Sequence, residues 1–158
     1  MKAYQWMLAA GVSLAVAGCA VSPEPQKTPM EIQSMQTRTF ETPKEVAFPS
    51  VVSVFQDLGY SIQTADIASG LISADSASEN SPWLTAFTGQ SQVRQTRATA
   101  FVEEIRDDTS VRLNFVESQE TSSAYGRSDR NDTPIHDAEV YQNAFERIEN
   151  AIFVREGR

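Results

Sequence analysis

The chain has 158 residues, of which 41% are hydrophobic and 22% are charged, and its formal net charge at pH 7 is −8. This length and apolar content predict a single domain with a core of its own. The acidic balance argues against a nucleic-acid partner, because phosphates attract Lys and Arg, and against electrostatic binding to anionic lipid.

Residues 1–18 have the pattern of a targeting segment rather than that of a folded element. Lys2 supplies a positive charge near the start, and the apolar run 6–18 follows it. A helix needs about 20 apolar residues to cross a bilayer, and this run is shorter. We therefore expect residues 1–18 to be a signal peptide whose removal leaves Cys19 at the new N-terminus.

The stretch Val16-Ala17-Gly18-Cys19 resembles the lipobox of bacterial lipoprotein precursors. The resemblance implies a thioether-linked diacylglycerol on Cys19, cleavage before this residue, and an acyl chain such as palmitate on the new amino group. Two or more such chains attach a protein stably to a membrane. Ala20 stands in place of the Asp typical of inner-membrane retention, which implies the outer membrane, with the domain in the periplasm. The alternative is an ordinary secretory signal followed by an incidental cysteine.

Three prolines and little periodicity mark the segment that follows the signal peptide. We expect residues 19–32 to be the lipidated Cys and a flexible, extended tether. Residues 33–158 then form a single α+β domain. Cys19 is the sole cysteine of the sequence, so this domain has no disulfide and depends on its core.

The first predicted elements are a short strand over 36–40 and a helix that ends at Gly59. Thr42 is expected to cap this helix, with Pro43 at its first position and Glu45 completing a capping box. Pro49 interrupts the apolar pattern of the helix. It predicts either a kink or a regular part that begins near residue 50.

Four further strands are predicted at 60–64, 71–74, 96–105 and 110–118, and the last two form a hairpin. Placing the hairpin turn at residues 107–108 sets Glu103 opposite Arg112. The same register gives one apolar face, made of Ala100, Val102, Val111, Leu113 and Phe115. Phe101 and Val116 fall on the other, outer face.

Residues 119–135 have no periodicity and are rich in turn formers, which predicts a mobile loop. A last helix begins at Thr133-Pro134, or alternatively at Asp137, and ends at Gly157. Its apolar stripe is typical of a helix packed on a core and comprises Tyr141, Ala144, Phe145, Ile148, Ala151 and Ile152. The order β-α-β-β-β-β-α predicts a two-layer α+β domain, with two helices on one face of an antiparallel sheet. The other face is then wet or free for a partner.

Several of these stretches resemble a family of small Gram-negative outer-membrane lipoproteins that has no assigned activity. The residues that carry the resemblance are 38–42, 55–60, Asp66 with 70–74, 140–142, Phe145, Ile148 and 151–153. The element order is also similar to the helix-grip modules of BamC, an accessory lipoprotein of the outer-membrane β-barrel assembly machinery. Pro49 departs from the smooth first helix of such proteins. The likeness to BamC is one of architecture, which does not fix function.

The sequence offers no recognisable catalytic or metal-binding constellation. His136 is the sole histidine and has no second His or Cys for a metal site. Asp107 and Asp108 suit a turn better than a pair of catalytic carboxylates. We therefore expect no enzyme activity, no metal and no cofactor apart from the lipid on Cys19.

Two groups of apolar residues remain as candidates for binding a partner. Trp83, Leu84 and Phe87 lie between a capping serine and Gly89. They are either an exposed aromatic anchor or a plug for one end of the core. The second group is the outer-face pair Phe101 and Val116, which can also be ordinary scattered surface residues.

These observations predict a non-enzymatic interaction, scaffold or assembly-accessory module of the cell envelope. Its partners would be the membrane, through the lipid, and another envelope protein. The alternative is a periplasmic carrier that holds a small apolar ligand or lipid between helices and sheet. Large core side chains such as Phe55 and Tyr141 favour a filled interior over a cavity.

Overall fold

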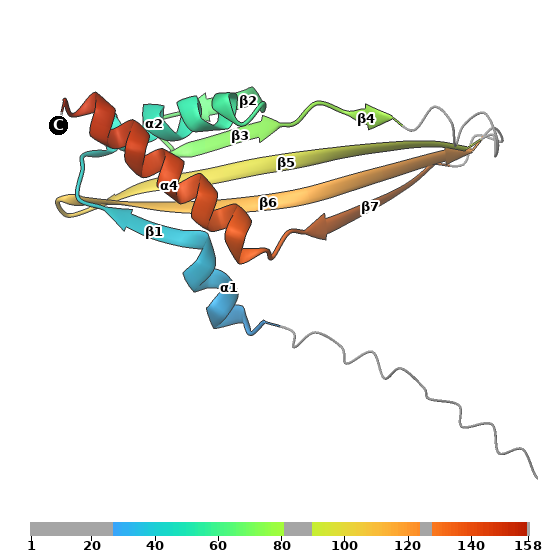
Figure 1. Ribbon diagram of the computed structural model, residues 1–158, viewed down its shortest axis with the longest axis horizontal. Coiled ribbons are helices and arrows are strands. Elements are labelled where there is room, and N and C mark those ends of the chain that lie inside the picture. The colour runs from blue at the N-terminus through green and yellow to red at the C-terminus, as the bar shows by residue number, and fades with distance from the viewer. Residues whose placement is uncertain (1–26, 81–89, 124–127, 158) are drawn as a thin grey trace, which may run out of the picture.

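The computed structural model describes residues 27–80, 90–123 and 128–157 (Figure 1). The elements in chain order are α1 (Pro29–Gln36), β1 (Thr37–Phe40), α2 (Lys44–Asp57), β2 (Ser61–Asp66), β3 (Leu71–Asp75), β4 (Glu79–Asn80), β5 (Gln90–Ile105), β6 (Asp108–Ser123), β7 (Ser128–Pro134) and α4 (Ala138–Arg155).

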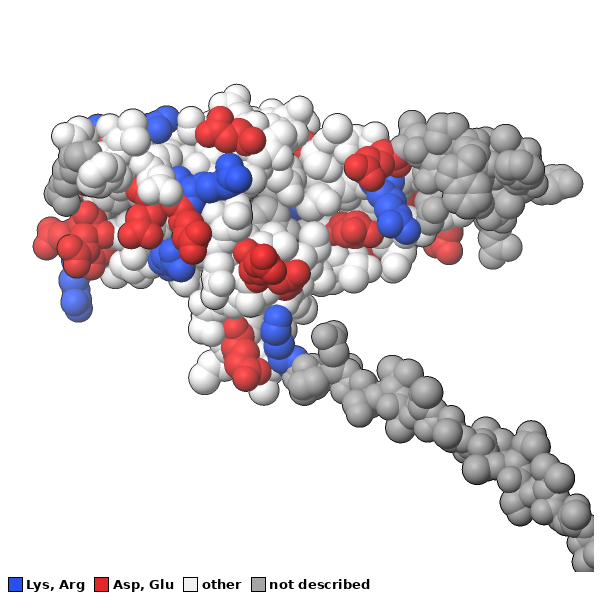
Figure 2. Space-filling model, viewed as in Figure 1, with Lys and Arg blue, Asp and Glu red and all other residues white. Residues whose placement is uncertain are grey.

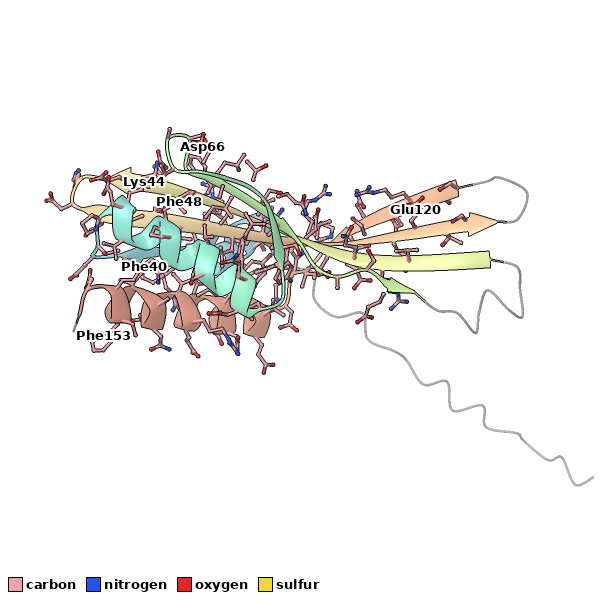
Figure 3. All side chains as sticks on the ribbon, turned by 90° about the horizontal axis from the view of Figure 1, so that it is seen from above. Phe40, Lys44, Phe48, Asp66, Glu120 and Phe153 are labelled. Atoms are coloured by element: carbon pink, nitrogen blue, oxygen red, sulfur yellow. The ribbon has the colours of Figure 1, made fainter. Side chains whose placement is uncertain are left out.

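The strands form one antiparallel sheet in the order β1-β6-β5-β3-β2, and β4 and β7 pair with the far halves of β5 and β6. Helices α2 and α4 lie side by side on one face of this sheet (Figures 1 and 3). The predicted two-layer α+β domain with two helices on one face is confirmed. The element order differs in the additional α1, β4 and β7.

The core lies between the two helices and the inner face of the sheet. Alternate residues of β3, β5 and β6 point into it, because successive side chains of a strand face opposite ways. The buried apolar side chains are Phe40, Ala47, Phe48, Val51, Val54, Phe55, Ile72, Ala74, Ala98, Ala100, Val102, Val111, Leu113, Phe115, Tyr141, Ala144, Phe145, Ile148 and Ile152. The predicted apolar face of the hairpin is therefore confirmed.

The register of the β5–β6 hairpin differs from the predicted one. Glu103 lies opposite Ser110, and Arg112 lies opposite Phe101, so the predicted Glu103–Arg112 pair is wrong. A tight turn at residues 106–107, in which Arg106 has φ 63°, replaces the turn expected at 107–108. The shift is two residues, so every side chain keeps its predicted face.

The start of α2 also differs from the expectation. Pro43 is the N-cap and has no side-chain capping bond, so the predicted Thr42 capping box is wrong. Thr42 is instead buried, and its hydroxyl donates to Glu156 Oε1 at 2.7 Å. The helix is regular from Lys44 onward and runs through Pro49, and the Ser50 hydroxyl donates to the carbonyl four residues earlier.

Helix α2 ends at the predicted glycine. Gly59 has φ 85°, in the left-handed region that favours glycine. The Tyr60 N–H donates to the Phe55 carbonyl and the Gly59 N–H to the Gln56 carbonyl, which is the bonding of a Schellman motif. The turn places the ring of Tyr60 5.9 Å from that of Phe55.

Two segments expected to lack regular structure are ordered. The chain is helical from Pro29, inside the expected tether, with a capping box formed by Thr28 and Glu31. The mobile loop expected over 119–135 is wrong, because β6 runs to Ser123 and β7 pairs with it. The last helix starts after Asp137, whose carboxylate accepts from the Glu139 N–H at 2.9 Å, and not at Thr133-Pro134.

Candidate binding surface

The sheet face opposite the two helices carries exposed apolar side chains at one end. Phe101 of β5 is 41% exposed on this face, as predicted. Leu71 of β3 lies directly beside it in the ladder and is 44% exposed, while Ile105 lies four residues further along β5 and is 50% exposed. Side chains at these positions share a face. We call Leu71, Phe101 and Ile105 the sheet-face patch.

Charged side chains lie beside and within the sheet-face patch. Arg112 pairs with Phe101 across the β5–β6 ladder, and Glu103 lies between Phe101 and Ile105 on the same face of β5. Both charged residues are exposed. An apolar centre with a polar rim is the usual composition of a protein interface.

The turn between β2 and β3 fixes the position of Leu71. The Asp66 carboxylate accepts hydrogen bonds from the Ser69 hydroxyl at 2.7 Å and from the backbone N–H groups of Ala68 and Ser69. These bonds hold the pKa of Asp66 below its ordinary value, the Ser69 hydroxyl being the main cause. Lys44 approaches this turn from α2 (Figure 3).

Gly70 completes the turn at a point where the backbone of β3 meets that of β5. Its φ is 76°, and its carbonyl accepts from the Val102 N–H at 2.8 Å. A Cβ at this position would overlap the Val102 carbonyl oxygen. The glycine is thus required for the close approach that sets Leu71 beside Phe101.

The structure does not bring the predicted pair Phe101 and Val116 together. Val116 is half-buried and pairs with Arg97 and Pro134. It lies four positions along β6 from the partner of Phe101, which corresponds to roughly 14 Å. An ion pair between Arg97 Nε and Asp75 Oδ1, at 2.8 Å, lies next to Val116 in the ladder. Phe101 therefore belongs to an apolar patch and Val116 to a polar region.

Leu71 and Ile105 were missed as partner-binding candidates by sequence reasoning. Ile105 shares the parity of Phe101 on the same strand, so the alternation could have revealed it. Leu71 could not be found in this way, because its place beside Phe101 depends on β3 being the neighbour of β5.

The other predicted site residues lie outside the described part of the chain. These are Cys19, Trp83, Leu84 and Phe87. Within the described ranges, no group of three or more His, Cys, Asp or Glu residues is arranged to hold a metal ion. No helix among the described residues is both long and apolar enough to cross a membrane. His136 is exposed.

No family model matches this chain, and no curated protein matches its sequence. The surface must therefore be interpreted from its own chemistry.

Proposed function

We propose that this protein is a non-enzymatic lipoprotein of the outer membrane, whose domain lies in the periplasm and binds another envelope protein through the sheet-face patch. The observation that carries the proposal is the pairing of the exposed side chains Leu71 and Phe101 across the β3–β5 ladder, with Ile105 further along the same face, on a side of the sheet that no described helix covers. Solitary exposed apolar residues are common, whereas adjacent ones with a charged rim are typical of interaction sites.

The N-terminal sequence supports the anchored part of the proposal. Cys19 follows a lipobox-like stretch, and α1 begins at Pro29. The nine residues between them could span about 30 Å if extended. Such a tether would keep the domain close to the membrane, where a partner anchored in the same membrane meets it at a high effective concentration.

The packing of the core gives more support to an interaction module than to a ligand carrier. The rings of Phe55, Phe115 and Tyr141 fill the space between the helices and the sheet, with centroids 5.2 to 6.3 Å apart. Phe40 and Phe145 pack 6.4 Å apart at the other end of the core. A carrier of the kind considered from the sequence would need this space for its ligand.

In-cell photocrosslinking tests the partner. A photoreactive phenylalanine at position 105 of the full chain should give a discrete adduct with one envelope protein, and Phe101→Ser should abolish it. The control position is Phe153, which is 53% exposed on α4, on the other side of the molecule. No adduct from position 105, or one unaffected by Phe101→Ser in a normally folded protein, would contradict the proposed surface.

Labelling with a palmitate analogue tests the anchor separately. The full chain should incorporate the label and sediment with the outer membrane. The variant Cys19→Ser should do neither. Label that persists in this variant would place the lipid elsewhere.

A further inference from the structure

A groove opens on the helix side of the sheet, where α2 ends and α4 begins. Its volume is about 380 Å³. Leu58, Tyr60, Phe115 and Val140 supply its apolar lining, and Asp137 and Glu139 stand at its edge. It lies on the face opposite the sheet-face patch and is separate from it.

The groove exists because the strands are longer than the helices that cover them. β5 and β6 each have 16 residues and continue past the ends of α2 and α4 (Figure 3). The Schellman turn after α2 sets the Tyr60 ring 6.3 Å from the ring of Phe115. The half-buried ring of Tyr60 is therefore left at the point where the helical layer stops, packed against the buried ring of Phe115.

Tyr60 gives the groove a polar group as well as an apolar wall. Its ring is half-buried, and burial raises the pKa of the phenol. Its hydroxyl has no hydrogen-bond partner among the residues that the structure describes. A bound segment could thus bury the ring and bond the hydroxyl, as commonly happens to Tyr at interfaces.

The charge around the groove is negative. Asp137 and Glu139 border it, and acidic side chains gather at this end of α4 in Figure 2. A second hollow is lined by Gly59, whose chain neighbours Leu58 and Tyr60 line the first. Glu79 and Glu117 also line the second hollow, with Arg94 opposite Glu79 in the ladder. The linings of the two hollows together contain four carboxylates and one guanidinium.

The protein itself already places one cation at this edge. Lys27, just before α1, donates from Nζ to the carbonyl of His136, the residue next to Asp137. Among the described residues, Glu139 and Glu117 form no ion pair, so a second positive charge from outside could pair with their carboxylates. Electrostatic complementarity of this kind selects partners more than it adds raw affinity.

We propose that this groove binds a segment of another protein that presents an apolar side chain next to a lysine or arginine. The apolar side chain packs on Tyr60, Phe115 and Val140, and the cation pairs with the carboxylates at the edge. The site is independent of the sheet-face patch, so each of the two surfaces can be refuted without the other.

Peptide titration followed by amide NMR tests the site on the full chain in a zwitterionic detergent. The probes are the acetylated, amidated tripeptides Lys-Phe-Lys, Glu-Phe-Glu and Lys-Gly-Lys. We expect Lys-Phe-Lys to shift the amides of Tyr60, Val140 and Glu139 in a saturable way. The other two probes should bind at least roughly threefold more weakly, since each lacks one half of the recognised chemistry.

A matched pair of double variants separates the groove from general charge effects. Glu117→Gln with Glu139→Gln should weaken Lys-Phe-Lys binding roughly threefold or more. Glu45→Gln with Glu104→Gln removes the same charge from exposed positions that line neither hollow and should change binding little. Equal binding of Lys-Phe-Lys and Glu-Phe-Glu, or equal weakening by both double variants, overturns the proposal.

Discussion

The hydroxyl of Tyr141 donates a hydrogen bond to the carbonyl oxygen of Ile135, 2.9 Å away. Tyr141 is fully buried, and the bond joins α4 to the segment that enters it from β7. The phenol oxygen of Tyr141 also accepts hydrogen bonds from Gln36 Nε2 at 3.3 Å and from the Phe115 N–H at 3.4 Å. One phenol oxygen therefore connects α1, β6 and α4 at the edge of the core.

Tyr141→Phe should lower the free energy of unfolding by about 1–3 kcal/mol, because it removes these bonds and leaves buried groups unpaired. Urea denaturation monitored by circular dichroism measures the change. Tyr60→Phe is the matched control, since its hydroxyl has no hydrogen-bond partner among the described residues, and it should change stability by less than about 0.5 kcal/mol. Equal losses for the two variants would refute the role of the Tyr141 oxygen.

Gly70→Ala should be far more damaging than Gly59→Ala, although both glycines have positive φ. The left-handed conformation costs a non-glycine residue about 1–2 kcal/mol at either position. At Gly70 the added Cβ also overlaps the Val102 carbonyl oxygen, whereas nothing lies within 4 Å at Gly59. We expect Gly59→Ala to fold with that modest loss and Gly70→Ala to lose at least about twice as much. Thermal and urea unfolding of both variants checks the ranking.

The inner face of the sheet could be predicted from the sequence because burial on one face leaves a period of two. Ala100, Val102, Val111 and Leu113 occupy alternate positions of their strands, and all four are buried. The register could not be predicted as well, because a shift of two residues keeps the same alternation. It is set by the turn, and Arg106 adopts a positive φ that its residue type does not signal.

The far half of the sheet, where β7 pairs with β6, shows no alternation of apolar and polar residues along β7. Every residue of β7 is exposed, so no face is buried and no alternation marks the strand. Helix α1 has no buried residue either and therefore no apolar stripe. The start of α1 could nonetheless have been predicted, because Thr28, Pro29 and Glu31 form the same pattern of capping residue and proline that predicted the starts of the other two helices.

The candidate surfaces depend on relationships between distant segments. Phe101 could be placed on the outer face from its own strand, whereas its contact with Leu71 requires the strand order β3-β5. The groove forms only where the end of α2 and the start of α4 meet above the long strands β5 and β6. Both surfaces therefore depend on the tertiary structure and cannot be predicted from a local sequence pattern.

The Asp66 turn should make stability depend on pH in the acid range. Its pKa is lowered below the ordinary value of 3.8, mainly by the Ser69 hydroxyl. Its stabilising effect is therefore fully present above that value and is lost as pH falls through the lower, folded-state pKa. Asp66→Asn should be less stable than wild type at pH 7, and the difference should shrink below about pH 4. Urea midpoints from pH 7 to pH 3 test this, and a difference that grows on acidification would contradict the sign.

Two threonines of neighbouring strands should respond in opposite ways to replacement by valine. The buried Thr109 hydroxyl donates to the Thr42 carbonyl at 2.6 Å, so Thr109→Val should cost about 1–3 kcal/mol by leaving that carbonyl without its donor. The Thr37 Oγ1 atom is buried and has no hydrogen-bond partner within the described ranges. Thr37→Val removes an unsatisfied polar atom and keeps a β-branched side chain suited to a strand, so it should leave stability unchanged or raise it by about 1 kcal/mol. Unfolding of the two variants in urea under identical conditions measures both changes. A loss at Thr37 as large as that at Thr109 would mean that packing of the hydroxyl, rather than its bonding, determines the effect.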